Sequence, residues 1–233
     1  MNLQRRSYKK ELLDSANLPF SDIKKNMEEL EFINTYLGGH KISITGFKKL
    51  LKDKKQIHVC EIGCGGGDNL FAILNWCNKH NIKINFTAID INQSCIEFAM
   101  TREILNDKTK WLISDYRTIN FENKPDIIFS SLFCHHFTNE ELVEQSKWMR
   151  ENSSIGFFIN DLQRNSLAYY SIKFLTKIFS KSYLVKNDAP LSVARGFIKK
   201  EWKNILNAAD IKSYQIQWRW AFRYLIIYFH ERN

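Results

Sequence analysis

A glycine-rich loop at residues 61–68 is the first segment whose residue types could do chemistry. It has the sequence Glu61-Ile62-Gly63-Cys64-Gly65-Gly66-Gly67-Asp68 and follows a short apolar run. Alternate glycines permit a sharp turn with positive φ and let a ligand lie against bare backbone. A P-loop needs Gly-Lys-Ser/Thr here, and a dinucleotide-binding loop needs Gly or Ala where Asp68 stands, so neither pattern fits. By itself, the loop is also typical of a tight strand-to-helix turn.

Acidic residues follow the next two expected strands. Asp90 ends one of them and can accept hydrogen bonds from both ribose hydroxyls of an adenosine. Asp115 follows the other and can accept the adenine amino hydrogen, with Tyr116 packed beside the ring. Because nothing in this set would neutralise a pyrophosphate, the acidic crevice favours a cofactor that carries a sulfonium and an ammonium group.

The set of motifs resembles the class I S-adenosylmethionine-dependent methyltransferases. The resemblance rests on Glu-x-Gly-x-Gly-x-Gly at 61–67, Asp90, Asp115 and the segment 130–137, all within residues 57–136. It implies an α/β, Rossmann-like seven-stranded sheet, mostly parallel with an antiparallel C-terminal hairpin, with helices on both faces. It also implies S-adenosyl-L-methionine as cofactor, with Gly63 and Gly65 facing its methionine moiety. The cofactor-binding set predicted in this way is Glu61, Gly63, Cys64, Gly65, Asp90, Ile91, Asp115, Tyr116 and Ser131.

Two adjacent histidines, His135 and His136, follow the fourth expected strand. A neutral imidazole there could take a phenolic or enolic proton near pH 7, although one ring could equally pack or cap the next helix. Methylases of nucleobase amines usually carry Asn/Asp-Pro-Pro-aromatic at this point, and residues 131–133 are Ser-Leu-Phe, which argues against a base amine. No tetrahedral ligand set with the usual spacing occurs, so we expect no metal ion.

The segment 162–197 interrupts the α/β alternation and is expected to hold the acceptor. Segments 160–165, 167–170 and 187–197, with 37–40 near the start, resemble a bacterial group of small-molecule methyltransferases related to the quinone methylases and often linked to phenolic or polyketide products. Histidines commonly occupy the positions of Gln163 and Asn165 in that group, so this chain departs from it there. Arg195 could grip an anionic oxygen, and we count it with the two histidines as catalytic; a salt bridge is the alternative. The predicted substrate-binding residues are His40, Asp161, Tyr169, Tyr170 and Arg195.

The composition fits one α/β domain. With 233 residues, 44% of them hydrophobic, the chain can bury a full core. We expect a helical cap at residues 1–55 and a methyltransferase domain at 56–233. No run of roughly 20 apolar residues and no signal peptide occurs, and the five cysteines are an odd number, so we expect a cytoplasmic protein with reduced thiols.

The net charge of +9 is unevenly distributed. Residues 1–55 carry +5, residues 56–161 carry −5 and residues 162–233 carry +9. Basic flanks can attract an anionic substrate, nucleic acid or an anionic membrane surface, or can simply be solvated. A predicted helix in the insert has an apolar stripe (Leu167, Tyr170, Phe174, Leu175, Ile178) beside a lysine stripe (Lys173, Lys177, Lys181), which is typical of a membrane-surface helix or of one that covers the sheet.

Hydrophobic periodicity predicts the elements. We expect strands at 57–61, 84–90, 111–114, 126–131, 155–161, 211–220 and 223–230, and helices at 7–36 (broken at Leu18-Pro19), through 47–51, through 70–77, and at 93–105, 139–150 and 198–208. The expected function is methyl transfer from S-adenosylmethionine to an oxygen or carbon of a small phenolic, quinone-like or polyketide-derived acceptor, with nucleic acid disfavoured as partner. The alternatives are an RNA or protein methyltransferase that uses the basic flanks, and a non-catalytic cofactor-binding protein of the same fold.

Overall fold

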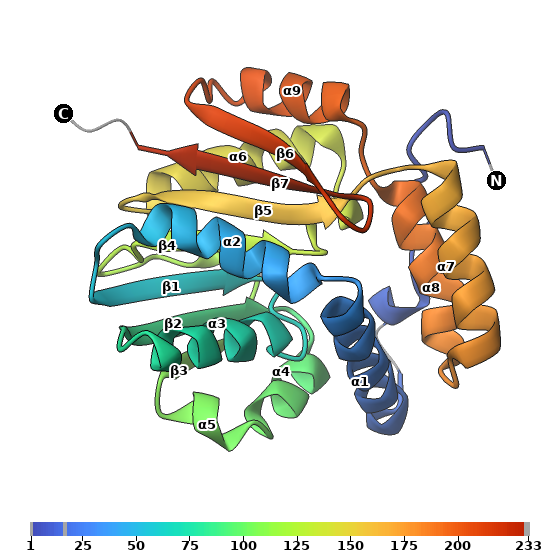
Figure 1. Ribbon diagram of the computed structural model, residues 1–233, viewed down its shortest axis with the longest axis horizontal. Helices are drawn as coiled ribbons and strands as arrows, with labels where there is room; N and C mark the ends of the chain where they lie inside the picture. Colours follow the sequence, from blue (N-terminus) through green and yellow to red (C-terminus); the bar gives the residue numbers. More distant parts are fainter. Residues whose placement is uncertain (1, 16–17, 231–233) are drawn as a thin grey trace.

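A seven-stranded mixed sheet forms the centre of the computed structural model, which describes residues 2–15 and 18–230 (Figure 1). The strand order is β3-β2-β1-β4-β5-β7-β6. The strands are β1 (Gln56–Ile62), β2 (Lys83–Asp90), β3 (Thr109–Ile113), β4 (Ile127–Ser131), β5 (Gly156–Leu162), β6 (Tyr214–Arg219) and β7 (Arg223–Phe229). Strands β1 to β5 are parallel, and β7 lies antiparallel between β5 and β6. The predicted Rossmann-like fold with an antiparallel closing hairpin is confirmed.

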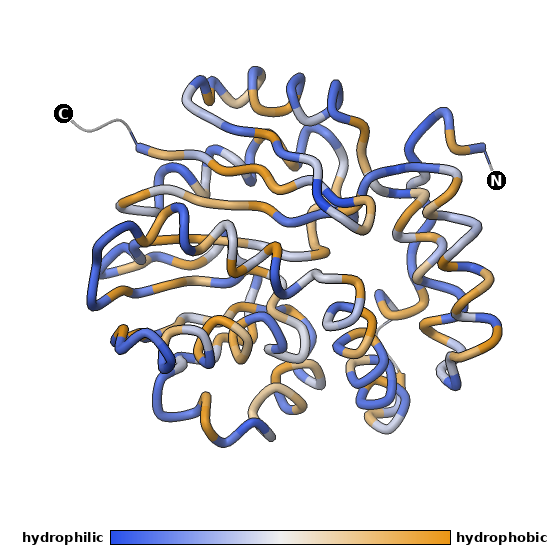
Figure 2. Tube along the Cα trace, viewed as in Figure 1, coloured by the Kyte–Doolittle hydropathy of each residue, from blue (hydrophilic) through white to orange (hydrophobic). Residues whose placement is uncertain are grey.

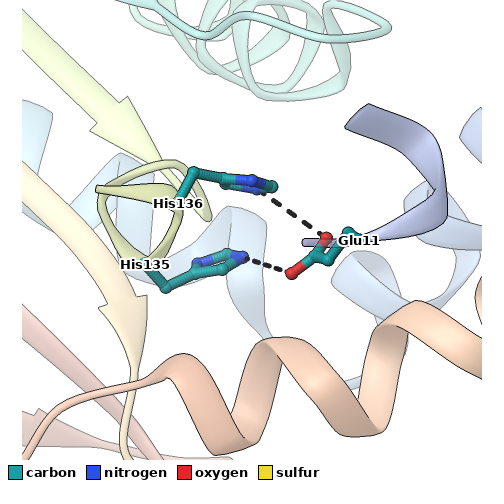
Figure 3. A group of neighbouring side chains, drawn as sticks. All are labelled: Glu11, His135 and His136. Carbon is teal, nitrogen blue, oxygen red and sulfur yellow. Dashed lines mark ion pairs between the residues drawn. The ribbon is translucent and has the colours of Figure 1, made fainter. Parts of the chain in front are cut away.

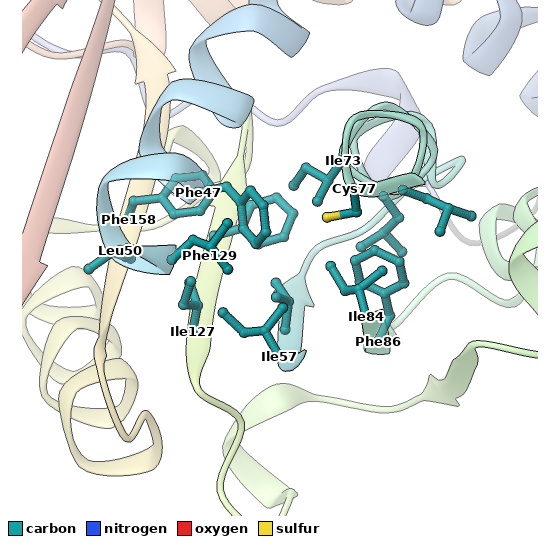
Figure 4. Packing of buried hydrophobic residues seen from close by; sticks show 14 of the residues in the cluster. Phe47, Leu50, Ile57, Ile73, Cys77, Ile84, Phe86, Ile127, Phe129 and Phe158 are labelled. Atoms are coloured by element: carbon teal, nitrogen blue, oxygen red, sulfur yellow. The ribbon is translucent and has the colours of Figure 1, made fainter. Parts of the chain in front are cut away.

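The strands at the centre of the sheet are apolar on both faces because helices cover both. Strand β4 is buried throughout, as a strand between two helical layers must be. One core lies under α2 (Gly39–Leu51) and α3 (Asp68–Lys79); Figure 4 shows Phe47, Phe129 and Phe158 packed there. The second core lies under α6 (Asn139–Asn152) and α9 (Lys199–Ala208). In Figure 2 hydrophobic stretches accordingly run along the central strands.

A third group of elements lies beyond the carboxyl ends of the parallel strands. It consists of η1 (Leu12–Asp14), α1 (Phe20–Tyr36), α7 (Ser166–Phe179) and α8 (Tyr183–Arg195), at the right of Figure 1. Asp188 of α8 joins this group to the N-terminal segment, because its two oxygens accept the N–H groups of Leu12 and Leu13 at 2.8 and 3.0 Å. Helix α2, in contrast, packs on the sheet, so this part of residues 1–55 belongs to the sheet layers and not to a cap.

Two expected helices differ from the structure. Residues 7–11 are not helical, and among the described residues before α1 only the short η1 is helical. The helix expected at 93–105 is divided into α4 (Gln93–Met100) and α5 (Glu103–Asn106). Arg102 lies at this break, where its guanidinium donates to the carbonyl of Gly66 at 3.0 Å and pairs with Glu31 at 2.7 Å. A tertiary contact of this kind overrides local helix propensity.

The outward face of α7 is apolar. Leu167, Tyr170, Phe174 and Ile178 follow one another at helical spacing and are 54–65% exposed. The opposite face of the helix carries Ala168 and Tyr169, which are buried. Along the part of the chain that the structure describes, every helix is too short or too polar to cross a bilayer.

Candidate active site

The glycine loop connects β1 to α3 at the carboxyl edge of the sheet. Gly63, Gly65 and Gly67 have φ values of +66°, +49° and +69°, which other residues rarely adopt. A Cβ atom on Gly63 would lie 2.1 Å from the ring of Phe133, so this position has no room for a side chain. At Gly65 the nearest atom to such a Cβ, Sδ of Met27, is 3.7 Å away. The backbone of Gly65 is therefore open to a ligand.

Three carboxylates surround this loop. Asp90 holds it, because Oδ2 accepts the N–H of Gly65 at 2.8 Å and Oδ1 accepts that of Asn92 at 2.9 Å. Glu61 is 1% exposed, and its Oε2 has no hydrogen-bond partner among the described residues. Burial raises the pKa of Glu61 well above its usual value, and the charges of Asp68 and Asp90 raise it further. A cationic ligand at this edge would relieve that repulsion.

The remaining predicted cofactor residues lie around the same edge in different surroundings. Asp115 caps a short 3₁₀ turn and pairs with Arg117, which lowers the pKa of the carboxyl group. Tyr116 is buried, and its ring packs edge-on to Trp148 at 5.1 Å between centroids. The side chain of Cys64, within the loop, is buried, and Ile91, which follows β2, is 77% exposed. Ser131 ends β4, where its Oγ accepts the amide of Asn160 at 3.3 Å.

His40 lies beside the glycine loop. Its Nε2 is 2.7 Å from Oδ2 of Asp68, the first residue of α3, and Asn34 donates to the same oxygen at 2.9 Å. These contacts lower the pKa of Asp68 although its burial acts in the opposite direction. The predicted substrate role of His40 is therefore not supported by its contacts, which connect α2 to the cofactor side of the edge.

A cluster of ionisable side chains lies where β4 and β5 end (Figure 3). Nδ1 of His135 is 2.8 Å from Oδ1 of Asp161, and its Nε2 is 3.5 Å from Oε1 of Glu11. Nε2 of His136 is 3.8 Å from the other oxygen of Glu11, and Asp14 lies 3.2 Å from its Nδ1. Burial alone would lower the pKa of His135, but Asp161 and Glu11 outweigh it and raise the pKa to about 9.

A cavity of about 360 Å³ borders this cluster. Its polar lining comes from Glu11, Asn26, His135, His136, Asp188, Ser171, Ser192 and Arg223. Its apolar lining comes mainly from α1, α7, α8 and the turn before β7, and includes Leu30, Ile33, Leu37, Leu132, Leu162, Leu167, Ile172, Leu175, Val185 and Trp220. The predicted insert thus forms one wall of a mostly apolar space with an ionisable corner.

Four predicted substrate residues do not face this cavity. The guanidinium of Arg195 is buried, and it donates hydrogen bonds to the carbonyls of His135 and Lys9 at 3.0 and 2.8 Å. It therefore fixes the backbone on which His135 stands. Asp161 is fully buried against His135. Tyr169 packs into a small core with Ala194, and Tyr170 is 59% exposed on the outward face of α7. These contacts give Arg195, Asp161 and Tyr169 structural roles in the ligand-free protein, and the roles predicted for the four residues toward the acceptor stay predictions.

Two residues of the cavity were missed by the sequence reasoning. Glu11 lies more than 120 positions before His135, and no motif marks it. Arg223 begins β7, is 2% exposed and donates through Nη2 to Asn34 at 2.8 Å. Its Nη1 has no hydrogen-bond partner among the described residues, and burial lowers its pKa to about 10. Only a fold that brings the start of β7 beside α1 reveals it.

Comparisons with known proteins agree with this architecture. Residues 59–152 match the family model described as a methyltransferase domain. No curated protein matches the chain. Among solved structures, the plantazolicin methyltransferase BpumL in complex with SAH is 18% identical, with a TM-score of 0.66 over 91% of this chain and 90% of its own.

Two further structures have the same fold. Human N-acetylserotonin methyltransferase in complex with SAM is 14% identical, with a TM-score of 0.64 over 91% of this chain and 56% of its own. Magnesium protoporphyrin IX methyltransferase from Synechocystis with bound SAM is 11% identical, with a TM-score of 0.57 over 93% and 100%. The strand order, the glycine loop at the carboxyl edge and the matched domain agree. Residues 59–152 match a methyltransferase domain, and the chain as a whole has the class I methyltransferase fold.

Proposed function

We propose that this enzyme transfers the methyl group of S-adenosylmethionine to an oxygen or carbon atom of a small, largely apolar acceptor. The observation that carries the proposal is the apolar cavity whose ionisable corner, Glu11 with His135 and His136, lies at the carboxyl ends of β4 and β5. That corner is near the cofactor edge, because the adjacent parallel strands β2, β1, β4 and β5 all end at the same edge of the sheet. Ligands of open α/β sheets bind at this edge.

The residues at the edge fit S-adenosylmethionine. Bound there, the cofactor would supply a methyl group activated by a positive sulfonium. Its methionine portion would lie over Gly65, where the backbone is open, and its positive groups would lie near the buried Glu61. Asp90 would receive the ribose hydroxyls, and Asp115 at the rim would receive the adenine amino group. The structures with bound SAM or SAH support this choice of cofactor.

The cavity favours a small molecule over a macromolecule as acceptor. Pockets for small ligands have this size and a mostly apolar lining with few polar groups. Helices α1, α7 and α8 form its walls, so a nucleobase or a protein side chain would have to enter past them. A phenolic, quinone-like or polyketide-derived ring fits an apolar space that ends at an ionisable corner. The free Nη1 of Arg223 supports a ligand with an anionic oxygen.

The chain's own residues would orient the acceptor and accept its proton. Apolar walls exclude water and hold the ring so that its nucleophilic atom faces the cofactor edge, and alignment supplies much of the acceleration. The cluster of Glu11, His135 and His136 would take up the proton of the acidic hydroxyl or C–H group, because these ionisable side chains line the cavity beyond the carboxyl end of β4. Asp161 fixes the ring of His135 from behind.

Calorimetric titration tests the proposal in two steps. The purified protein is first titrated with S-adenosylmethionine and with its demethylated product, and micromolar binding of both is expected. Phenols, quinones and polyketides are then screened for methyl uptake with a radiolabelled methyl group. A folded protein that binds neither cofactor form would contradict the proposal. Cofactor binding with methylation only of RNA or protein would favour the macromolecular alternative.

We also propose that the outward face of α7 contacts an anionic membrane surface from which a lipophilic acceptor enters the cavity. Leu167 belongs both to this exposed face and to the cavity lining, so the two surfaces are continuous. Lys173 and Lys177 flank the stripe, which is the arrangement of interfacial helices. A second copy docked through the same face would bring these lysines near their own counterparts, so a lipid surface is favoured.

A further inference from the structure

The cluster of Glu11, His135 and His136 has the spacing of a metal-ligand set. One potential ligand atom from each residue lies within 4.8 Å of the other two, and the ring nitrogens face the two carboxylate oxygens at 3.5 and 3.8 Å (Figure 3). These separations are longer than hydrogen bonds. Two ligands that each lie about 2.1 Å from one ion are about 3.0–3.5 Å apart. The two separations between Glu11 and the histidines are therefore within a few tenths of an ångström of those that an ion requires, and the three ligand atoms together lie within 4.8 Å.

The second ring nitrogen of each histidine is held by a carboxylate. Nδ1 of His135 is 2.8 Å from Oδ1 of Asp161, and Nδ1 of His136 is 3.2 Å from Oδ1 of Asp14. In metal sites the ligating histidine donates its other N–H to such a carboxylate, which fixes the tautomer and the ring orientation. Both Nε2 atoms are thereby left to point at Glu11, whose Oε1 also accepts the hydroxyl of Ser192 at 2.8 Å.

The surroundings of the cluster favour a cation. Four carboxylates belong to it or border it, Glu11, Asp14, Asp161 and Asp188, against three guanidinium groups, Arg6, Arg195 and Arg223. Glu11 and His135 are 6% and 3% exposed, so water screens their charges poorly. A divalent ion would offset the excess of carboxylates, and its binding would displace the proton from the ring of His135.

We propose that Glu11, His135 and His136 bind one divalent transition-metal ion. Two imidazoles and one carboxylate suit Zn²⁺, Mn²⁺ or Fe²⁺, whereas Mg²⁺ and Ca²⁺ prefer oxygen ligands alone. Because all three residues line the cavity, the open coordination positions face the acceptor. This part rests on the proposed function: an acceptor oxygen bound to the ion would be oriented there and would lose its proton more easily. The proposal differs from the expectation that no metal ion is bound, because Glu11 lies far in sequence from the two histidines and forms no motif with them.

Metal binding is testable without turnover. Tag-free protein is stripped with a chelator and titrated with Zn²⁺ and Mn²⁺ by calorimetry, and with Co²⁺ by visible absorption. One equivalent is expected to bind. His136→Asn and Glu11→Gln should each weaken binding by more than the roughly 10–100-fold that the loss of an outer-shell partner costs. His80→Asn, which alters an exposed histidine stacked on Trp76, should bind like the unaltered chain.

The partial exposure of His136, 23% for its side chain, makes His136→Asn the safer variant, and its circular dichroism spectrum confirms folding. Absence of stoichiometric binding, or binding that His136→Asn leaves unchanged, would overturn the proposal. Titration of the stripped protein with the demethylated cofactor separates the two claims. Retained cofactor binding with no metal binding contradicts only the metal site, and loss of both contradicts the proposed function as well.

Discussion

The backbone N–H of Gly65 donates to Oδ2 of Asp90 over 2.8 Å, so the side chain that ends β2 also shapes the loop that follows β1. The other oxygen of Asp90 holds Asn92, the N-cap of α4. This carboxylate therefore connects two adjacent strand ends before any ligand is bound. It is the residue whose substitution tests the cofactor assignment most directly.

Asp90→Asn is expected to weaken S-adenosylmethionine binding by on the order of 10- to 100-fold, because a charged acceptor for two ribose hydroxyls is replaced by a neutral amide. Calorimetry measures the change. Asp107→Asn, at an exposed position, is the matched control and should bind normally. Equal affinities of the two variants would show that the ribose does not lie at Asp90.

Alanine at the two loop glycines should have different effects. Gly63→Ala places a methyl group 2.1 Å from the ring of Phe133, so we expect a loss of about 2–4 kcal/mol of unfolding free energy. Gly65→Ala meets no atom closer than 3.7 Å, so it should cost about 1–2 kcal/mol, mainly from its positive φ, and should chiefly reduce cofactor affinity. Urea unfolding and calorimetry measure the two effects. A Gly65→Ala variant with normal affinity would show that no ligand lies against this residue.

Glu61→Gln should stabilise the ligand-free protein at neutral pH. Burial raises the pKa of Glu61 above 4.5, so the folded chain keeps a proton that the unfolded chain releases. Below about pH 4 Glu61 is protonated in both states, so the substitution should have little effect on the unfolding free energy. As the pH rises through 4.5, ionisation of Glu61 stabilises the unfolded state of the unaltered chain and lowers its unfolding free energy. The Gln variant has no such group and keeps its stability. The gain in unfolding free energy is measured from melting temperatures at pH 4 and pH 7, where 1 kcal/mol corresponds to a shift of about 2–4 °C. Glu122→Gln, at an exposed site, should shift neither value. An increase at pH 4 as large as that at pH 7 would contradict the assignment.

Substitutions of two buried arginines should have different effects, one on stability and the other on acceptor binding. Arg195→Met removes the donor to the carbonyls of His135 and Lys9, so it should lower the unfolding free energy by about 2–4 kcal/mol. Arg223→Met removes the free Nη1 in the cavity lining, so it should raise the acceptor KM about tenfold. Chemical denaturation and steady-state kinetics separate the two. If Arg195→Met changed only KM, the original prediction for that residue would be supported.

Ile178→Ser tests the membrane surface. The side chain is 54% exposed on the outward face of α7, and its loss should reduce co-sedimentation with vesicles that contain anionic lipid about three- to tenfold. Ile104→Ser is the matched control, because that residue is 51% exposed on α5 and should have no effect. Vesicles of neutral lipid should bind the unaltered chain poorly. Equal sedimentation of all three proteins would contradict a role for this face.

The sequence was sufficient for features that depend on local patterns. Strands buried on both faces read as apolar runs, and Gly63, Gly65 and Asp90 stand at strand ends, so their position at one edge follows from the order of the elements. The site residues that were missed depend on contacts between distant segments. Nothing near Glu11 indicates that it meets His135, and nothing near Arg195 shows that two backbone carbonyls occupy its guanidinium. Side-chain direction in the insert was equally hidden, as Tyr170 shows.

Because the N-terminal segment is attached to α8, it is synthesised before α8 but can reach its final position only after α8 has been made. Residues 7–13 are synthesised before their anchors, Asp188 and the carbonyl of Ala194, which follow more than 170 residues later. Glu11 therefore has no fixed place during most of translation, and the corner of the cavity is completed only after the insert has folded.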